Sequence, residues 1–250
     1  MTRLLRAEAL RLAITRAYWL LAIGATVLIA GGIAATSAAT SFTPDPSPAR
    51  SVLAMAGLAQ TVALIAGVLS VTSEFRHKTI TSAVLITPRR TPLLAAKLIA
   101  LAAAGLVFGL ATTAIATATA LPLLAARHIP AGLTGSGAAA IIAGGGVATA
   151  LSAAIGIGAG AVIRNQVSAI VAVLALLYVG EPLLGFIPHV GTAVQQYGIG
   201  GLAAATTHTT GFPDTANLLG QPVAALVLAG YGIVALIAGA ALLGRRDITT

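Results

Sequence analysis

Long apolar runs, separated by short polar or proline-rich segments, dominate the pattern of this chain. These runs are apolar on every side, unlike the alternating pattern of a strand or the single apolar stripe of a soluble helix. Runs of roughly 20 apolar residues are typical of membrane-crossing helices. The pattern predicts six such helices in one transmembrane domain spanning residues 1–250, and therefore an all-α integral membrane protein. The helices are expected at about 17–40, 51–73, 93–124, 138–163, 167–187 and 222–244.

The segments between these runs support the division. Residues 41–50, SFTPDPSPAR, contain three prolines and cannot form a helix. Residues 188–221 are polar and rich in Gly and Thr, and form a long connection before the last span. The third run is longer than a crossing requires, so its helix is expected to tilt, to project beyond the membrane, or to break at Pro122.

Composition agrees with a membrane protein and excludes several classes. The 250 residues are 58% hydrophobic and only 8% charged, whereas soluble domains carry about 25% charged residues. Too few charges are present to cover a water-soluble globule. The chain has no cysteine, which excludes disulfides, thiolate metal sites and cysteine nucleophiles.

The net charge of +8 bears on orientation in the membrane. Six spans place both termini on one side, and twelve of the fourteen Lys and Arg residues fall on that side. Only Arg50 and Arg127 fall on the other. Because cationic loops stay in the cytoplasm, both termini, including segment 1–16, are predicted to be cytoplasmic, and residues 41–50 and 188–221 to lie outside.

The cytoplasmic loop between the second and third spans concentrates charge in the stretch EFRHKTITSAVLITPRRTPLLAAK, residues 74–97. Part of it has the spacing of a short helix with one apolar face. Pro88 disfavours helix at the residue before it, so this helix should end nearby. The face is made by Ile80, Ala83, Val84 and Thr87. We expect a surface helix that contacts another protein; the alternative is a cationic loop that only sets topology and touches lipid headgroups.

The order Glu-Phe-Arg-x-x-Thr, then Thr-Pro-x-Arg and Leu-Leu-x-x-Lys, resembles the permease subunits of type 2 ABC exporters. Span number, orientation and the long external segment extend the resemblance over the whole chain. The positions that match are Glu74, Phe75, Arg76, Thr79, Leu85, Pro88, Arg90 and Lys97.

The resemblance implies a mechanism and partners. Residues 74–92 would form a coupling loop whose helix, about 79–87, docks on a separate cytoplasmic ATP-binding subunit. Arg89 would belong to the same contact, and Glu74 and Arg76 would tie the second span to it. Two permease chains, identical or different, would pair in a bacterial plasma (inner) membrane. Short helices within 188–221 would dip back into the outer leaflet and cap the substrate path; the alternative is an ordinary extracellular loop.

Signatures of independent chemistry are missing from the sequence. It contains no G-x-x-x-x-G-K-[ST] phosphate-binding loop, no His-Glu-x-x-His motif and no Gly-x-Ser-x-Gly elbow. We expect no catalytic residue, metal site or nucleic-acid partner in this chain, which is then not an enzyme by itself. ATP and Mg would bind to the partner subunit.

Three features within the spans leave alternatives open. Gln60 is either an interhelical hydrogen-bonding group or a lining of the substrate path. Glu181 could line that path or bond a neighbouring helix, or could lie at the wet interface beside a helix break at Pro182. The small residues at Ala154, Gly156, Gly158 and Gly160 could pack within the subunit or form a dimer seam.

The prediction is an exporter subunit that moves an amphipathic or apolar substrate, such as a drug, lipid or peptide antibiotic, out of the cytoplasm. An ATPase-independent transporter or channel is the first alternative. An intramembrane enzyme is a weaker one, because the spans lack paired acids and metal ligands.

Overall fold

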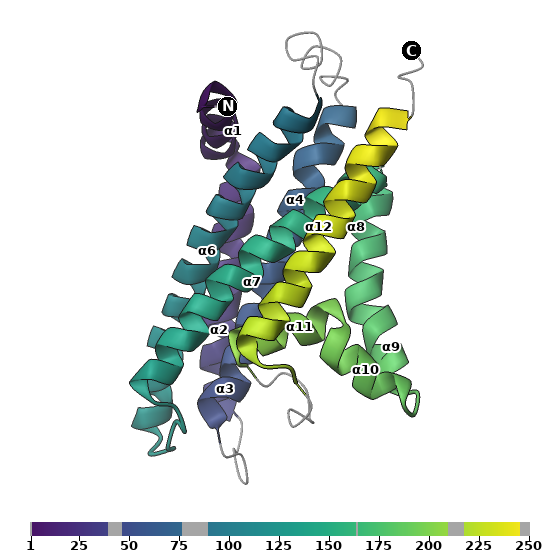
Figure 1. Ribbon diagram of the computed structural model, residues 1–250. Helices are drawn as coiled ribbons and strands as arrows, with labels where there is room; N and C mark the ends of the chain where they lie inside the picture. The colour runs from purple at the N-terminus through teal and green to yellow at the C-terminus, as the bar shows by residue number, and fades with distance from the viewer. Residues whose placement is uncertain (1, 40–46, 77–89, 164, 210–217, 246–250) are drawn as a thin grey trace.

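The computed structural model describes residues 2–39, 47–76, 90–163, 165–209 and 218–245 (Figure 1). Side chains are described for residues 4–39, 47–74, 95–163, 165–209 and 218–242. Within the described ranges all regular structure is helical. The elements are α1 (Thr2–Ile14), α2 (Arg16–Ala39), α3 (Pro48–Leu53), the 3₁₀ helix η1 (Ala54–Gly57), α4 (Leu58–Arg76), α6 (Arg90–Ala126), α7 (Gly135–Val162), α8 (Gln166–Ala175), the π-helix η2 (Leu176–Gly180), α9 (Glu181–Gly185), α10 (Val190–Tyr197), α11 (Ile199–Thr207) and α12 (Gln221–Arg245).

The predicted all-α class with six spans is confirmed. Six helical stretches are long and apolar enough to cross a membrane: Arg16–Ala39, Pro48–Glu74, Ala95–Ala126, Gly135–Val162, Gln166–Gly185 and Gln221–Leu242. Their ends lie within a few residues of the predicted ones. The prediction that residues 41–50 cannot form a helix is wrong for the last three, because α3 begins at Pro48, and a proline is tolerated in the first turn of a helix. The start of α1 and the end of α12 lie at one end of the bundle, as an even number of spans requires (Figure 1). That this end faces the cytoplasm remains a prediction from charge.

Helix α7 is the centre of the bundle and packs against α4, α6 and α12. Its glycines permit very close approach: a Cβ built on Gly156 would lie 2.1 Å from the carbonyl oxygen of Leu64 in α4. A Cβ on Gly158 would lie 2.4 Å from the Cβ of Ala235 in α12. The stripe of small residues is therefore used for packing within the chain, which is one of the two uses considered from the sequence.

Two spans are less regular than predicted. The second span is not one helix, because the 3₁₀ helix η1 separates α3 from α4. The fifth contains the π-helix η2 between α8 and α9, and the chain stays helical past Pro182. The third span does not break at Pro122, because α6 continues through this residue to Ala126. Proline removes only one backbone donor, and neighbouring helices make this tolerable inside a membrane span.

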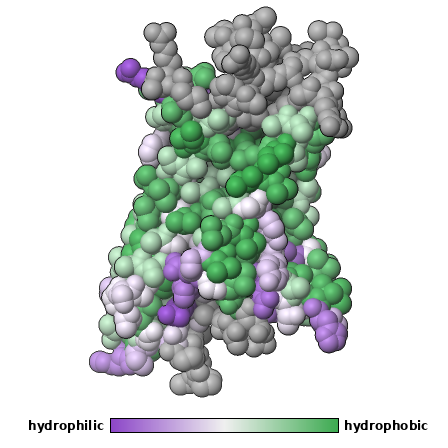
Figure 2. All heavy atoms as spheres, in the orientation of Figure 1, coloured by the Kyte–Doolittle hydropathy of each residue, from purple (hydrophilic) through white to green (hydrophobic). Residues whose placement is uncertain are grey.

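The two ends of the bundle carry different short helices. Figure 1 shows α1 nearly end-on, so it lies across the spans, while α10 and α11 lie at the opposite end. Apolar side chains cover the middle of the face in Figure 2, and hydrophilic ones appear toward the α10–α11 end. Helix α11 is largely buried and packs against α7 and α12. Short helices within 188–221 were expected, and α10 and α11 are such helices.

Candidate functional site

Four charged side chains meet where α1, α4 and α6 converge. Lys97 of α6 donates from Nζ to Glu8 Oε2 at 3.2 Å and to Glu74 Oε1 at 2.9 Å. Arg11 Nη1 of α1 donates to the same Oε1 of Glu74. The ionic cluster, defined as Glu8, Arg11, Glu74 and Lys97, therefore joins the N-terminal helix to the second and third spans.

The cluster is buried at its centre and balanced in charge. Lys97 is 2% exposed and Glu74 is 7% exposed, while Arg11 is about half exposed. Two cations face two anions, so each buried charge has a partner, as the low-dielectric surroundings require. Burial acts to lower the pKa of Arg11, but the hydrogen bond to Glu74 and its charge outweigh burial and raise that pKa above its ordinary value. Arg11 therefore remains charged.

The predicted coupling residues are only partly within the described chain. Glu74 and Lys97 lie in the ionic cluster, on the two helices that flank the loop. The backbones of Phe75, Arg76 and Arg90 are helical, but their side chains are outside the described set. The remaining predicted contacts lie outside the described residues: Thr79, Ile80, Ala83, Val84, Thr87, Pro88 and Arg89.

Sequence reasoning missed Glu8 and Arg11 as members of the cluster. Their spacing of three residues places them on one face of a helix, which is the signal that could have drawn attention to them. No sequence rule, however, pairs Arg11 with Glu74, which is 63 positions away.

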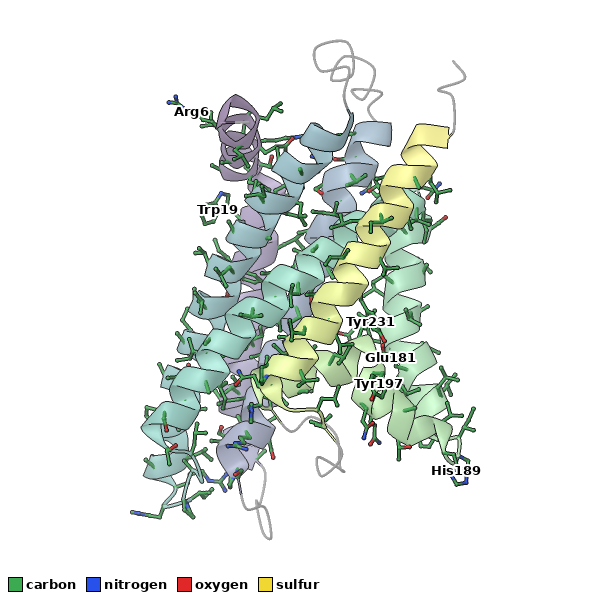
Figure 3. All side chains as sticks on the ribbon, viewed as in Figure 1. Arg6, Trp19, Glu181, His189, Tyr197 and Tyr231 are labelled. Carbon is green, nitrogen blue, oxygen red and sulfur yellow. The ribbon has the colours of Figure 1, made fainter. Side chains whose placement is uncertain are left out.

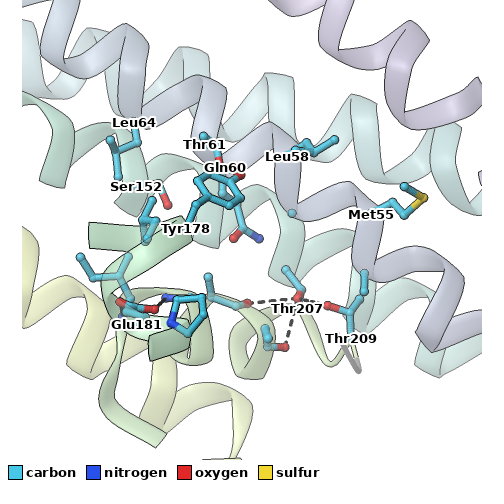
Figure 4. A pocket seen from close by; sticks show the side chains of 18 residues that line it. Met55, Leu58, Gln60, Thr61, Leu64, Ser152, Tyr178, Glu181, Thr207 and Thr209 are labelled. Atoms are coloured by element: carbon cyan, nitrogen blue, oxygen red, sulfur yellow. Dashed lines mark hydrogen bonds between the residues drawn. The ribbon is translucent and has the colours of Figure 1, made fainter. Parts of the chain in front are cut away.

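A cavity of about 450 Å³, shown from close by in Figure 4, lies away from the α1 end of the bundle, where Figure 3 labels the lining residue Glu181. One wall is formed by η1 and α4 with Ser152 of α7, and the other by η2, α9 and α11. Both irregular helices, η1 and η2, contribute to the lining. Gln60 and Glu181, the two residues considered for the substrate path, line this one cavity.

Glu181 fastens the N-terminus of α11. Its Oε1 accepts the N–H of Ile199 at 2.6 Å, and its Oε2 accepts the N–H of Gly200 at 2.9 Å. The first backbone N–H groups of a helix have no partner within the helix, and a carboxylate there is favoured by the helix dipole. Glu181 thus bonds a neighbouring helix, which is one of the roles left open by the sequence.

Gln60 has a different environment. The residue is 8% exposed, and its amide points into the cavity (Figure 4). No hydrogen bond among the described residues satisfies this amide, so Gln60 is a lining group and not an interhelical bridge. At the rim, the hydroxyls of Thr61 and Tyr178 are 2.9 Å apart and connect the two walls. The π-turn at η2, which shifts the helical register, is what places Tyr178 there.

Comparisons with known proteins give no further guide to the site. No protein-family profile matches the chain, and no curated protein matches it.

Proposed function

We propose that this chain is the membrane-spanning subunit of an ATP-driven exporter of the ABC type. It would dimerise, dock on separate ATP-binding subunits, and move an amphipathic or apolar substrate out of the cytoplasm. The ionic cluster is the observation that carries the proposal. It fixes the helix entering segment 77–89 and the helix leaving it to each other and to α1.

A loop that only sets topology does not need such a cluster. Exposed lysines and arginines suffice to hold a loop in the cytoplasm. Burying Glu74 and Lys97 costs desolvation, which their contacts must offset. Such a cluster would be useful if a force applied to segment 77–89 had to displace α4 and α6 together.

Helix α4 also connects the cluster to the cavity. Gln60 and Glu74 both lie on this helix, about 14 positions apart, which corresponds to about 21 Å along its axis. A displacement of α4 at the cluster end would therefore be transmitted to one wall of the cavity. Energy from a cytoplasmic ATPase would act on a site at the external end by this route.

The test is co-purification of the tagged chain from its native membrane in mild detergent. An ATPase with its own phosphate-binding loop should accompany the unchanged chain and should be lost with Val84→Asp. Ser82→Asp is the matched control, because position 82 is on the opposite face of the predicted coupling helix. If no ATPase appears even after gentle cross-linking, the proposal fails and an ATPase-independent transporter or channel replaces it.

A further inference from the structure

We propose that the cavity between α4 and α11 binds an amphipathic amine, meaning a molecule with an apolar body and a cationic, hydrogen-bond-donating head. The inference rests on the proposed function and deepens it, since such amines would be the substrate class. It is carried by the size of the cavity, the character of its walls and the unpaired amide of Gln60.

Size and wall chemistry suit a small amphipathic molecule. The volume of about 450 Å³ falls within the roughly 300–1,000 Å³ of small-molecule sites. Most of the wall is apolar, with Leu58 and Leu64 from one side and Leu177 and Ile199 from the other. A ligand would bury an apolar body against these groups.

The amide of Gln60 indicates that the occupant has a polar group. An amide that faces a cavity and has no partner within the protein keeps its hydrogen-bonding groups available to an occupant of that cavity. Gln60 is more than nine-tenths buried and points into the cavity (Figure 4). Its oxygen accepts and its nitrogen donates, so a ligand with a hydrogen-bonding head would satisfy what the described chain leaves unpaired.

The polarity of the lining favours a cationic head. Among the described lining residues none is Lys, Arg or His, and the one charged group is Glu181. Each Glu181 oxygen accepts one backbone N–H and keeps a further lone-pair direction. The Thr61, Tyr178 and Thr207 hydroxyls add acceptors. An anionic head would meet no cation here, whereas an ammonium would meet acceptors and a negative field.

The test is a fluorescence titration of the purified full chain in lipid nanodiscs, with empty nanodiscs subtracted. The probe is monodansylcadaverine, an apolar fluorophore carrying a free amine. Its N-acetyl derivative removes the charge, and dansyl-aminohexanoic acid reverses it. The amine should bind at least about tenfold more tightly than either analogue, which corresponds to about 1.4 kcal/mol. Equal binding of amine and acetylated probe would overturn the proposal and indicate a purely apolar or lipid-filled cavity.

Substitutions at residues that line the cavity test whether the probe binds there. Gly57 lines the cavity, and a Cβ there meets no atom within 4 Å, so Gly57→Leu adds an apolar side chain at the cavity wall and is expected to abolish binding. Gly24→Leu is the matched control, because Gly24 is equally open but lies in α2, away from the cavity. Gln60→Leu should weaken amine binding about tenfold, and Glu181→Gln should remove the preference for the amine over the acetylated probe. Unchanged binding by both Gly57→Leu and Gln60→Leu would place the probe elsewhere and refute the site. Circular dichroism confirms that each variant is folded.

The outcome is independent of the ATPase experiment, because the titration uses the chain alone. Amine binding without a co-purifying ATPase would retain the site and reject the exporter proposal. A co-purifying ATPase without amine binding would retain the exporter proposal and reject the amine site.

Discussion

Removing the ammonium of Lys97 should destabilise the protein strongly, because this group holds the ionic cluster together. Lys97→Met keeps most of the apolar stem but leaves Glu74 and Glu8 without their shared donor. At an effective dielectric constant of 20, contacts of 2.9 and 3.2 Å correspond to Coulomb energies of about 6 and about 5 kcal/mol. Most of this is offset by the desolvation of the buried ions.

Breaking a buried pair by removing one partner costs about 3–5 kcal/mol. The lower end applies here, because Glu74 keeps its contact with the half-exposed Arg11. We expect Lys97→Met to lower the free energy of unfolding by about 3 kcal/mol. The double change Lys97→Met with Glu74→Gln should cost less than the single one, because no uncompensated buried anion remains at position 74.

The assay is equilibrium unfolding in mixed micelles with increasing dodecyl sulfate, followed by far-ultraviolet circular dichroism. The control is Arg6→Met, which removes an exposed cation from the same helix α1 (Figure 3) and should change stability by less than about 0.5 kcal/mol. If Lys97→Met were no more destabilising than Arg6→Met, the cluster would contribute little and the reasoning would be wrong.

Three further predictions follow from the packing, the cavity and the charged loop. Gly156→Ala should lower the free energy of unfolding by about 1–3 kcal/mol, because its Cβ would meet a backbone carbonyl. Gly24→Ala, where the space is open, should leave that free energy unchanged in the same unfolding assay. Equal effects of the two substitutions would contradict the packing argument. Glu181→Ala should leave two N–H groups of α11 without their acceptor and raise amide hydrogen exchange in 190–207 over the unchanged chain, with 135–162 of α7 as the internal control. Arg89→Glu with Arg90→Glu should leave membrane insertion intact but reduce export in cells, and unchanged export would reject the coupling assignment.

The spans were predictable from the sequence and their irregularities were not. An apolar run of roughly 20 residues has few alternatives to a membrane helix, so the six stretches were placed within a few residues. The same runs are equally apolar whether they wind as α-, 3₁₀- or π-helix. The sequences AMAG at η1 and LLYVG at η2 therefore carried no clear sign of their geometry.

The candidate sites were predictable in part for a similar reason. Glu74 and Lys97 were singled out because charge beside membrane spans is conspicuous. Their partners were not, since Glu8 lies 89 positions from Lys97 in sequence, and only the fold brings them together. Gln60 and Glu181 were noticed as polar groups within spans. Their shared cavity depends on how α11 returns between the spans, which no local pattern encodes.

The close packing of α4 on α7 also decides how the cavity can change volume. Glycine contacts bring these two backbones together, and 67% of the most apolar stretch of α7 is buried, against 6% for the fifth span. Separating α4 from α7 would break many contacts at once, whereas the η2 wall is tied to α4 at the rim by the Thr61–Tyr178 hydrogen bond. The η2 wall also meets α4 through Leu177, which packs against the apolar cluster that contains Leu64. Displacing the η2 wall would therefore change the cavity volume at a smaller loss of buried contact than displacing α4 from α7.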